Sequence, residues 1–267
     1  MDNSNGFTRR EFMGSSARVV AYTTALAGIE FIVNGCVKEE VPVKEIPEKQ
    51  NVMVLKDEFT GIDRRRWNWR VGGAAYHYLT SEGVKLGLKA TANDKFYSIA
   101  EFYNPTNLFM YNFAQVRLKN DNLGKGSRGW GFWNGSMDIN KIKTAWFARF
   151  QGPENYFLNG FYAITTTFGK SRRTRVKDIS LEDWHTYSID WQKDRVIFWI
   201  DDVPVVEHKA DIPKSNMQFD VWLDNSVYMR KGDDIRLIYQ NIGKETSLQV
   251  DNLTILKLAE PYQPQSQ

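Results

Sequence analysis

The chain has 267 residues, of which 42% are hydrophobic and 14% are aromatic, and its formal net charge at pH 7 is +3. A chain of this size can form one domain with a full core, because all-β sandwiches often exceed about 200 residues as a single unit. The small net charge gives no reason to expect nucleic acid as a partner. The nine Trp and twelve Tyr residues suit a protein that stacks on sugar rings, although a Trp-rich core accounts for any one of them equally well.

The first 36 residues have the pattern of an export signal. Arg9 and Arg10 precede an apolar run over residues 19–33, and a basic segment followed by such a run is typical of a signal peptide. Paired arginines in this position resemble the twin-arginine type of signal, which exports proteins that are already folded. The run is too short for a good membrane span. We therefore expect an exported protein.

Cys36 is the only cysteine of the chain and closely follows the apolar run. A lone cysteine is usually a small buried hydrophobe, but the sequence VNGC at residues 33–36 resembles a bacterial lipobox, in which the cysteine is lipidated. Residues 37–50 then contain two prolines, four glutamates and three lysines, a composition typical of a solvated tether. The sequence therefore predicts a lipoprotein anchored through Cys36 at a cell-envelope membrane, on its periplasmic or extracellular face.

Residues 51–260 have the pattern of one β-sandwich domain, and residues 261–267 follow as a tail. Period-2 alternation places Tyr187, Ile189 and Trp191 on one face of a strand, and Asp201-Asp202 has the composition of a hairpin turn. Turn-forming residues separate the short apolar segments at intervals of about 8–12 residues, which predicts a single antiparallel β-sandwich of the jelly-roll type. The clearest strand segments are residues 84–90, 96–103, 184–191, 195–202 and 248–258.

Six segments occur in a familiar order: DEFTGIDRRRWNW, TSEGVKLGLKA, MYNFAQVRLK, GWGFWNGSM, WHTYSIDWQKDRVIFWIDDVPV and LQVDNLTIL. This order resembles glycoside hydrolase family 16, the laminarinase-like jelly rolls with a concanavalin A-like fold. The resemblance covers about residues 57–258. It implies that the partner is a polysaccharide or oligosaccharide and that any enzymatic activity is O-glycosyl hydrolysis.

The family's active strand departs from its pattern here. Family members carry Glu-x-Asp-x-x-Glu, in which one Glu attacks the anomeric carbon and the other protonates the leaving oxygen, at a separation of about 5–5.5 Å. Counting from Phe132-Trp133 aligns the three acids with Ala145, Phe147 and Phe150, and residues 139–153 contain no carboxylate. The sequence therefore predicts that the family's usual catalysis is absent.

Strand alternation predicts what the cleft presents instead of the acids. Ala145, Phe147, Arg149 and Gln151 share one face of the strand, and we expect that face to line the cleft. Arg and Gln can donate to sugar hydroxyls, to a uronate or to a sulfate, although Arg149 is equally compatible with a solvated sheet surface. The predicted glycan-binding residues are Trp130, Trp133, Phe147, Arg149, Gln151 and Trp222.

Carboxylates from other segments offer an alternative. Glu154 follows the strand, Asp138 ends the preceding strand, and Asp220, Trp222 and Asp224 share one face of a late strand. Pairing Glu154 with Asp224 or with Asp138 would relocate the two catalytic acids. The simpler interpretation is that Glu154 is a loop carboxylate and that Asp224 ends its strand in a turn.

The sequence indicates neither a metal nor a cofactor. His77, His185 and His208 are scattered without metal-ligand spacing, and the resemblance implies a structural role for His185 at a strand start. Related sandwiches bind calcium between their first and last strands, where only Asp57, Glu58 and Asp251 are available here, which is a poor signal.

Residues 169–178, GKSRRTRVKD, contain five basic side chains between two expected strands. They suit an acidic glycan, held through charge-assisted hydrogen bonds. They equally suit a solvated hairpin tip or a surface that faces anionic lipid headgroups near the anchor.

Three functions remain compatible with the sequence. The main prediction is an exported, lipid-anchored carbohydrate-binding sandwich that lacks the family's catalysis. The alternative is a polysaccharide-cleaving glycosidase with relocated carboxylates. The third is an envelope scaffold that does not bind sugar, because a fold does not determine a function.

Overall fold

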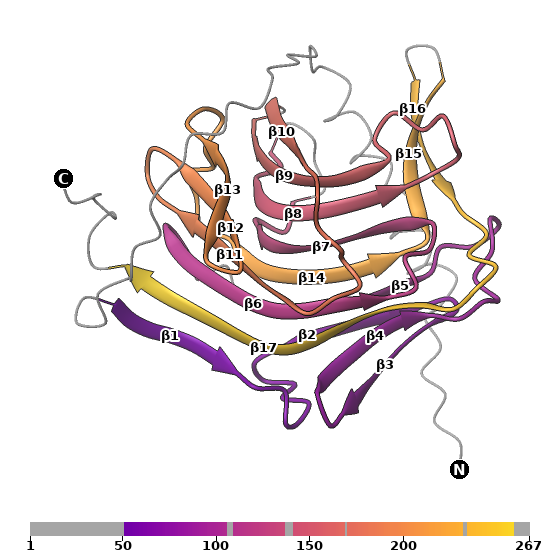
Figure 1. The fold of residues 1–267 in the computed structure, drawn as a ribbon, viewed down its shortest axis with the longest axis horizontal. Coiled ribbons are helices and arrows are strands. Elements are labelled where there is room, and N and C mark those ends of the chain that lie inside the picture. The colour runs from indigo at the N-terminus through magenta and orange to yellow at the C-terminus, as the bar shows by residue number, and fades with distance from the viewer. Residues whose placement is uncertain (1–50, 106–108, 137–140, 169, 232–233, 259–267) are drawn as a thin grey trace.

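The computed structural model describes residues 51–105, 109–136, 141–168, 170–231 and 234–258. These residues form two packed antiparallel sheets, which confirms the predicted all-β jelly-roll sandwich (Figure 1). The export signal with Arg9 and Arg10, the lipidation site Cys36, the tether, the tail and Asp138 lie outside the described residues. Within the described ranges, no helix is long and apolar enough to cross a membrane.

Each sheet brings together strands that are distant in the sequence, as Figure 1 shows. The eight-stranded sheet has the order β13 (Val203–His208), β12 (Val196–Ile200), β11 (His185–Trp191), β6 (Asn112–Asp121), β17 (Thr246–Leu258), β4 (Gly83–Leu88) and β3 (Ala75–Thr80), and β1 (Asn51–Asp57) also pairs with β17. The seven-stranded sheet has the order β10 (Lys170–Val176), β9 (Gly160–Thr167), β8 (Thr144–Gln151), β7 (Gly126–Trp133), β14 (Gln218–Asp224), β5 (Ile99–Tyr103) and β2 (Asn68–Gly72). The hairpin of β15 (Ser226–Lys231) and β16 (Asp234–Tyr239) forms a separate two-stranded unit.

The main core lies between the two sheets and consists of alternate residues of each strand. Tyr187, Ile189 and Trp191 of β11 all belong to it, which confirms the predicted alternation. The ring of Trp130, from the opposite sheet, lies 4.6 Å from that of Tyr187. Burial of each such side chain contributes about 1.5–3 kcal/mol to folding, so this alternation determines which face of each strand points inward.

The turn between β12 and β13 lies where the sequence predicts it. Asp201 and Asp202 have φ angles of 49° and 62°, in the left-handed region that Asp tolerates. Asp201 also accepts a hydrogen bond from the Thr186 amide at 2.8 Å and contacts His185 Nδ1 at 2.5 Å. His185 is the first residue of β11, and its contact with Asp201 ties the start of that strand to the turn. This is the structural role that the resemblance implied.

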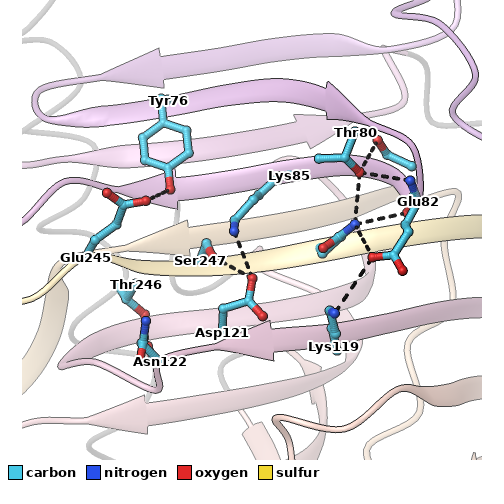
Figure 2. Close-up of polar contacts among 12 residues, drawn as sticks. Tyr76, Thr80, Glu82, Lys85, Lys119, Asp121, Asn122, Glu245, Thr246 and Ser247 are labelled. Carbon is cyan, nitrogen blue, oxygen red and sulfur yellow. Dashed lines mark hydrogen bonds and ion pairs between the residues drawn. The ribbon is translucent and has the colours of Figure 1, made fainter.

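The outer face of the eight-stranded sheet is polar, and its side chains pair with one another (Figure 2). The Tyr76 hydroxyl donates to Glu245 at 2.5 Å, and Lys85 Nζ lies 2.9 Å from Asp121 Oδ2. Ser247 also donates to Asp121, at 3.2 Å. These contacts join β3, β4, β6 and β17, and exposed pairs of this kind each contribute at most about 1 kcal/mol. The acids and donors of this network are therefore already paired with one another.

Candidate functional site on the outward face of the seven-stranded sheet

The outward face consists of the side chains of the seven-stranded sheet that point away from the eight-stranded sheet. On β8, Ala145 and Phe147 belong to the core between the sheets, whereas Trp146, Ala148 and Phe150 belong to a second apolar cluster on the outward face. The predicted orientation of β8 is therefore reversed. Alternation identifies two faces of a strand, but the residues that fill the core from the other sheet decide which one points inward.

The reversal corrects several predicted glycan contacts. Trp130 and Phe147 are 0% exposed and pack in the core between the sheets, so they present no surface to a glycan. Arg149 lies on the same inward-facing side, where it donates to the Gly124 carbonyl at 2.9 Å and to Gln151 Oε1 at 3.1 Å. Burial lowers the pKa of Arg149 to about 10. Arg149 and Gln151 thus bond to each other and to the backbone near the end of β8.

Trp133 and Trp222 are the two predicted binding residues that lie on the outward face. The Trp222 ring centroid lies 4.7 Å from that of Trp146, and Trp222 Nε1 donates to Ser127 Oγ at 3.2 Å. A Cβ atom built on Gly129 would lie 2.2 Å from the Trp222 ring, so only glycine allows the indole to lie over β7. The indoles of Trp133, Trp146 and Trp222 form an aromatic floor on the outward face. Val227, from the hairpin of β15 and β16, packs with them.

Three carboxylates lie on the outward face, on strands other than β8. Asp220, Trp222 and Asp224 alternate with the core residues Phe219 and Val221 along β14, so the predicted face of these three is correct. In the neighbouring strand β5, Glu101 pairs in register with Trp222. The acids that β8 lacks are therefore present on the same sheet face, on β14 and β5, which lie two and three strands away from β8.

Glu101 and Asp220 form a buried carboxyl pair. Each is 3% exposed, and their carboxyl groups are in hydrogen-bonding contact. Arg70 of β2 places its Nε atom 2.6 Å from Glu101 Oε2. The guanidinium is about one-third exposed and is the charged partner that a buried carboxylate requires.

The surroundings of this pair shift the pKa values of the two carboxyls to different extents. Burial and the charge of Glu101 raise the pKa of Asp220 well above its usual value. Burial also raises the pKa of Glu101, but Arg70 and the hydrogen bond from Asp220 oppose this shift. Of the two carboxyls, Asp220 is therefore the one that holds a proton to higher pH.

Asp224 and Glu154, two of the acids proposed from the sequence, have surroundings that differ from those of Glu101 and Asp220. Asp224 accepts hydrogen bonds from the backbone and hydroxyl groups of Ser226 and from Ser127 and Tyr97, so it satisfies the simpler interpretation of a strand-ending turn. Glu154 is exposed in the loop after β8, and its carbonyl accepts from Asn159 at 3.2 Å. Whether Glu154 takes part in catalysis stays a prediction.

Several buried polar atoms on the outward face have no hydrogen-bond partner among the described residues. They include Thr144 Oγ1, Trp146 Nε1 and Asp220 Oδ1. Buried polar atoms are normally paired, so such a group requires an explanation. A bound sugar, which offers both donors and acceptors, would supply the missing partners.

The expected calcium ligands are occupied by protein contacts. Asp57 accepts from the Trp67 indole at 2.7 Å, Asp251 lies 2.6 Å from Arg117 Nη1, and Glu58 lies 2.7 Å from Lys56. Across the described ranges, no three His, Cys, Asp or Glu side chains are grouped as metal ligands would be. His208 is buried between Thr165 and Thr174, and burial lowers its pKa to about 3.

Sequence reasoning missed Glu101 and Arg70. Glu101 is the one acid in the apolar segment FYSIAEFY, between Ala100 and Phe102, which are both core residues. A lone acid in such a strand is a usable signal, because unpaired carboxylates are rarely buried. Its partners lie on β2 and β14, and strand order is not readable from one sequence.

Comparison with known proteins identifies the family. The profile of glycosyl hydrolases family 16 matches residues 63–230. Crh-like protein CRH12 of Candida albicans (strain SC5314) is 26% identical over 193 residues, which are 66% of this chain and 36% of that relative. This chain thus matches about a third of its curated relative.

Solved structures show the same fold. The apo Crh5 transglycosylase has a TM-score of 0.53 and 16% identity, over 78% of this chain and 85% of that one. The Bacillus licheniformis β-glucanase has a TM-score of 0.52 and 12% identity, over 76% of this chain and 97% of that one. The profile match, which covers more than half of the sequence, shows that the chain belongs to glycoside hydrolase family 16.

Proposed function

We propose that this protein processes a polysaccharide on the outward face of the seven-stranded sheet, with Glu101 and Asp220 in place of the acids that the family carries on its active strand. The observation that carries the proposal is the buried carboxyl pair of Glu101 and Asp220 beside Arg70, in which the pKa of Asp220 is raised. Family membership supports a glycosidic bond as the target, and the names of similar proteins include a transglycosylase and a β-glucanase.

The pair supplies both groups that retaining chemistry needs. Asp220 gives its proton to the glycosidic oxygen, the bond from that oxygen to C1 breaks, and ionised Glu101 bonds to C1. Water or a sugar hydroxyl then displaces Glu101 and returns a proton to Asp220. The mechanism requires about 5–5.5 Å between the carboxyls, which exceeds a hydrogen-bonding contact. The sugar must therefore enter between Glu101 and Asp220.

Hydrolysis and transfer give different products, which tests the proposed reaction. The protein is incubated with laminarin, xyloglucan or carrageenan, each together with a fluorescent oligosaccharide of the same sugar. Longer fluorescent chains indicate transfer, and new reducing ends without longer fluorescent chains indicate hydrolysis. The absence of both products with every polymer would argue against processing.

A second function, glycan binding without cleavage, is favoured by β8 itself. The outward positions of that strand are Trp146, Ala148 and Phe150, which are all apolar and buried. Where the family carries acids on its active strand, β8 therefore carries apolar side chains of the outward cluster. In the product experiment, this function predicts retention on a polymer without any new chain end.

Replacement of Trp222 by alanine is expected to weaken binding of the glycan by about 1–3 kcal/mol, because a stacked aromatic anchor is lost. Trp199, half-buried on the outer side of the eight-stranded sheet, provides the matched control. Affinity is measured by gel retardation at increasing polymer concentration. Equal affinities of the folded Trp222→Ala and Trp199→Ala variants would remove Trp222 from the binding surface, and the same comparison applies to Trp133.

We also propose that the protein is exported and anchored through a lipid on Cys36. The support is the signal-like pattern of Arg9 and Arg10, the apolar run and the lipobox-like sequence. Cells fed with a labelled fatty acid should incorporate the label into the protein and retain it in the membrane fraction. The Cys36→Ala variant should lose the label, and a variant that keeps it would contradict lipidation at this residue.

A further inference from the structure

The basic segment expected as a hairpin tip is mostly a strand. Residues 170–176 form β10, which is the edge strand of the seven-stranded sheet. Its sequence, KSRRTRV, contains four basic residues and no acidic one. Among the strands that the structure describes, none pairs with its outer edge, so a ligand can approach this end of the outward face along that edge.

Two of these residues point to the outward face. Arg173 and Arg175 pair in register with Ile164 and Tyr162 of β9, which belong to or pack on the outward cluster. Arg172, the residue before Arg173, points to the opposite face of the strand. Burial is the main cause of the lowered pKa of His208, and the charge of Arg172 also contributes to it. The alternation of β10 thus divides its arginines between the two faces.

The two outward arginines lie close together beside Tyr162. Their Cα atoms are separated by about 6.6–6.8 Å, which is two steps along a strand. Burial raises the pKa of Tyr162, and the charges of Arg175 and Arg173 both oppose that shift, which places both guanidiniums near one phenol. A Cβ atom built on Gly160 would lie 3.0 Å from Arg175 Nε, so the glycine provides the space in which that guanidinium lies.

Neither arginine has an ion-pair partner among the described residues. Arg173 is half-buried, its Nη1 atom is buried without a hydrogen-bond acceptor in the described ranges, and burial lowers its pKa. A buried charge normally has a counter-charge, because removal from water is unfavourable. The Arg173 guanidinium therefore lacks the anion that a buried charge requires, and the exposed guanidinium of Arg175 lies beside it.

We propose that Arg173 and Arg175 form a subsite for an anionic group of the glycan, either a sulfate ester or a uronate carboxylate. The planar donor fork of arginine binds such oxyanions through two parallel hydrogen bonds. An anionic lipid surface fits less well, because it would select the most exposed cations, whereas Arg173 is half-buried and its Nη1 atom is buried. The subsite rests on the proposed function, since it selects the polysaccharide that reaches Glu101 and Asp220.

The subsite lies away from the carboxyl pair. Four strand spacings separate β10 from β14, or about 19 Å. Recognition of the anionic group and bond cleavage are therefore separable by mutation. Loss of the arginines should reduce affinity for charged polymers and leave turnover of a bound neutral polymer unchanged.

The test compares the double variant Arg173→Gln/Arg175→Gln with Arg172→Gln, which removes a charge from the opposite face of the same strand. Binding to dextran sulfate, polygalacturonate, laminarin and phosphatidylglycerol vesicles is measured at low and at moderate salt. The double variant should lose at least tenfold affinity for one of the two charged polymers and none for laminarin. Arg172→Gln should lose less than twofold. A loss of affinity for dextran sulfate alone would identify a sulfate site, and a loss for polygalacturonate alone would identify a carboxylate site.

Three results would overturn the subsite: unchanged affinity in the double variant, an equal loss in Arg172→Gln, or a loss confined to phosphatidylglycerol vesicles, which would identify a membrane-facing surface. Comparable unfolding midpoints show that the variants are folded.

Charge-selective binding without turnover would contradict the proposed function alone. Turnover of laminarin without charge selection would contradict the subsite alone.

Discussion

Replacement of Asp220 by asparagine should lower turnover of the polysaccharide by about 10²–10⁴-fold, the usual contribution of a general acid. The variant should still fold, because asparagine matches aspartate in size and places no charge in this buried site. Affinity for the polymer should change little, since the aromatic floor is intact. Initial rates and gel retardation, measured on the same preparation, separate the two effects.

The pH dependence of the same variant adds an independent criterion. The raised pKa of Asp220 keeps the acid protonated at neutral pH, so wild-type turnover should fall as the pH rises through that pKa. The asparagine variant has no such group, and its residual turnover should lack this alkaline limb. Asp202→Asn, at an exposed turn position with positive φ that asparagine tolerates, is the matched control.

The variant Glu154→Gln decides between the two sets of carboxylates. If the pair of Glu101 and Asp220 does the chemistry, this substitution in an exposed loop should leave turnover nearly unchanged. Loss of turnover in Glu154→Gln, with wild-type rates in Asp220→Asn, would instead support the loop acid proposed from the sequence.

Replacement of Trp130 by alanine should lower the free energy of unfolding by about 3–5 kcal/mol, the cost of removing a large core aromatic and leaving a cavity. Trp130 is 0% exposed, and its ring lies 4.6 Å from Tyr187 and 5.7 Å from Phe161. Few neighbours can move into the space, because they belong to strands fixed in both sheets. Urea denaturation measures the loss as a lower midpoint at constant slope.

The control for Trp130 is Trp199→Ala, which removes a half-buried indole from the outer side of the other sheet and should cost clearly less. Equal losses from the two substitutions would contradict the placement of Trp130 in the core. So would a Trp130→Ala variant of full stability that binds glycan more weakly, because that result would return Trp130 to the binding surface.

The strands were predictable because their apolar residues alternate locally. Tyr187, Ile189 and Trp191 predicted a core face, and the turn at Asp201-Asp202 lies where its composition indicates. The orientation of β8 was not predictable in this way. Phe147 points inward because its ring packs against Tyr187 and Phe198 of the other sheet, at 5.3 Å and 5.1 Å. Such contacts depend on tertiary packing.

The candidate site was predictable only in part, for a related reason. Trp222 and Asp220 were placed correctly because their alternation along one strand is local. Glu101 and Arg70 become meaningful only when β5 lies between β14 and β2, an order set by long-range strand pairing. The absence of acids from the expected strand indicated lost catalysis, whereas the sheet brings other carboxylates to the same face.

The most direct test of glycan processing on this sheet is native electrophoresis of the protein in gels that contain laminarin, xyloglucan, agarose, carrageenan, alginate or pectin, followed by staining for polysaccharide. We expect slower migration in at least one gel, with a cleared zone around the band that Asp220→Asn does not produce. Slower migration without clearing would contradict processing and favour binding alone. Normal migration and intact staining in every gel would contradict both.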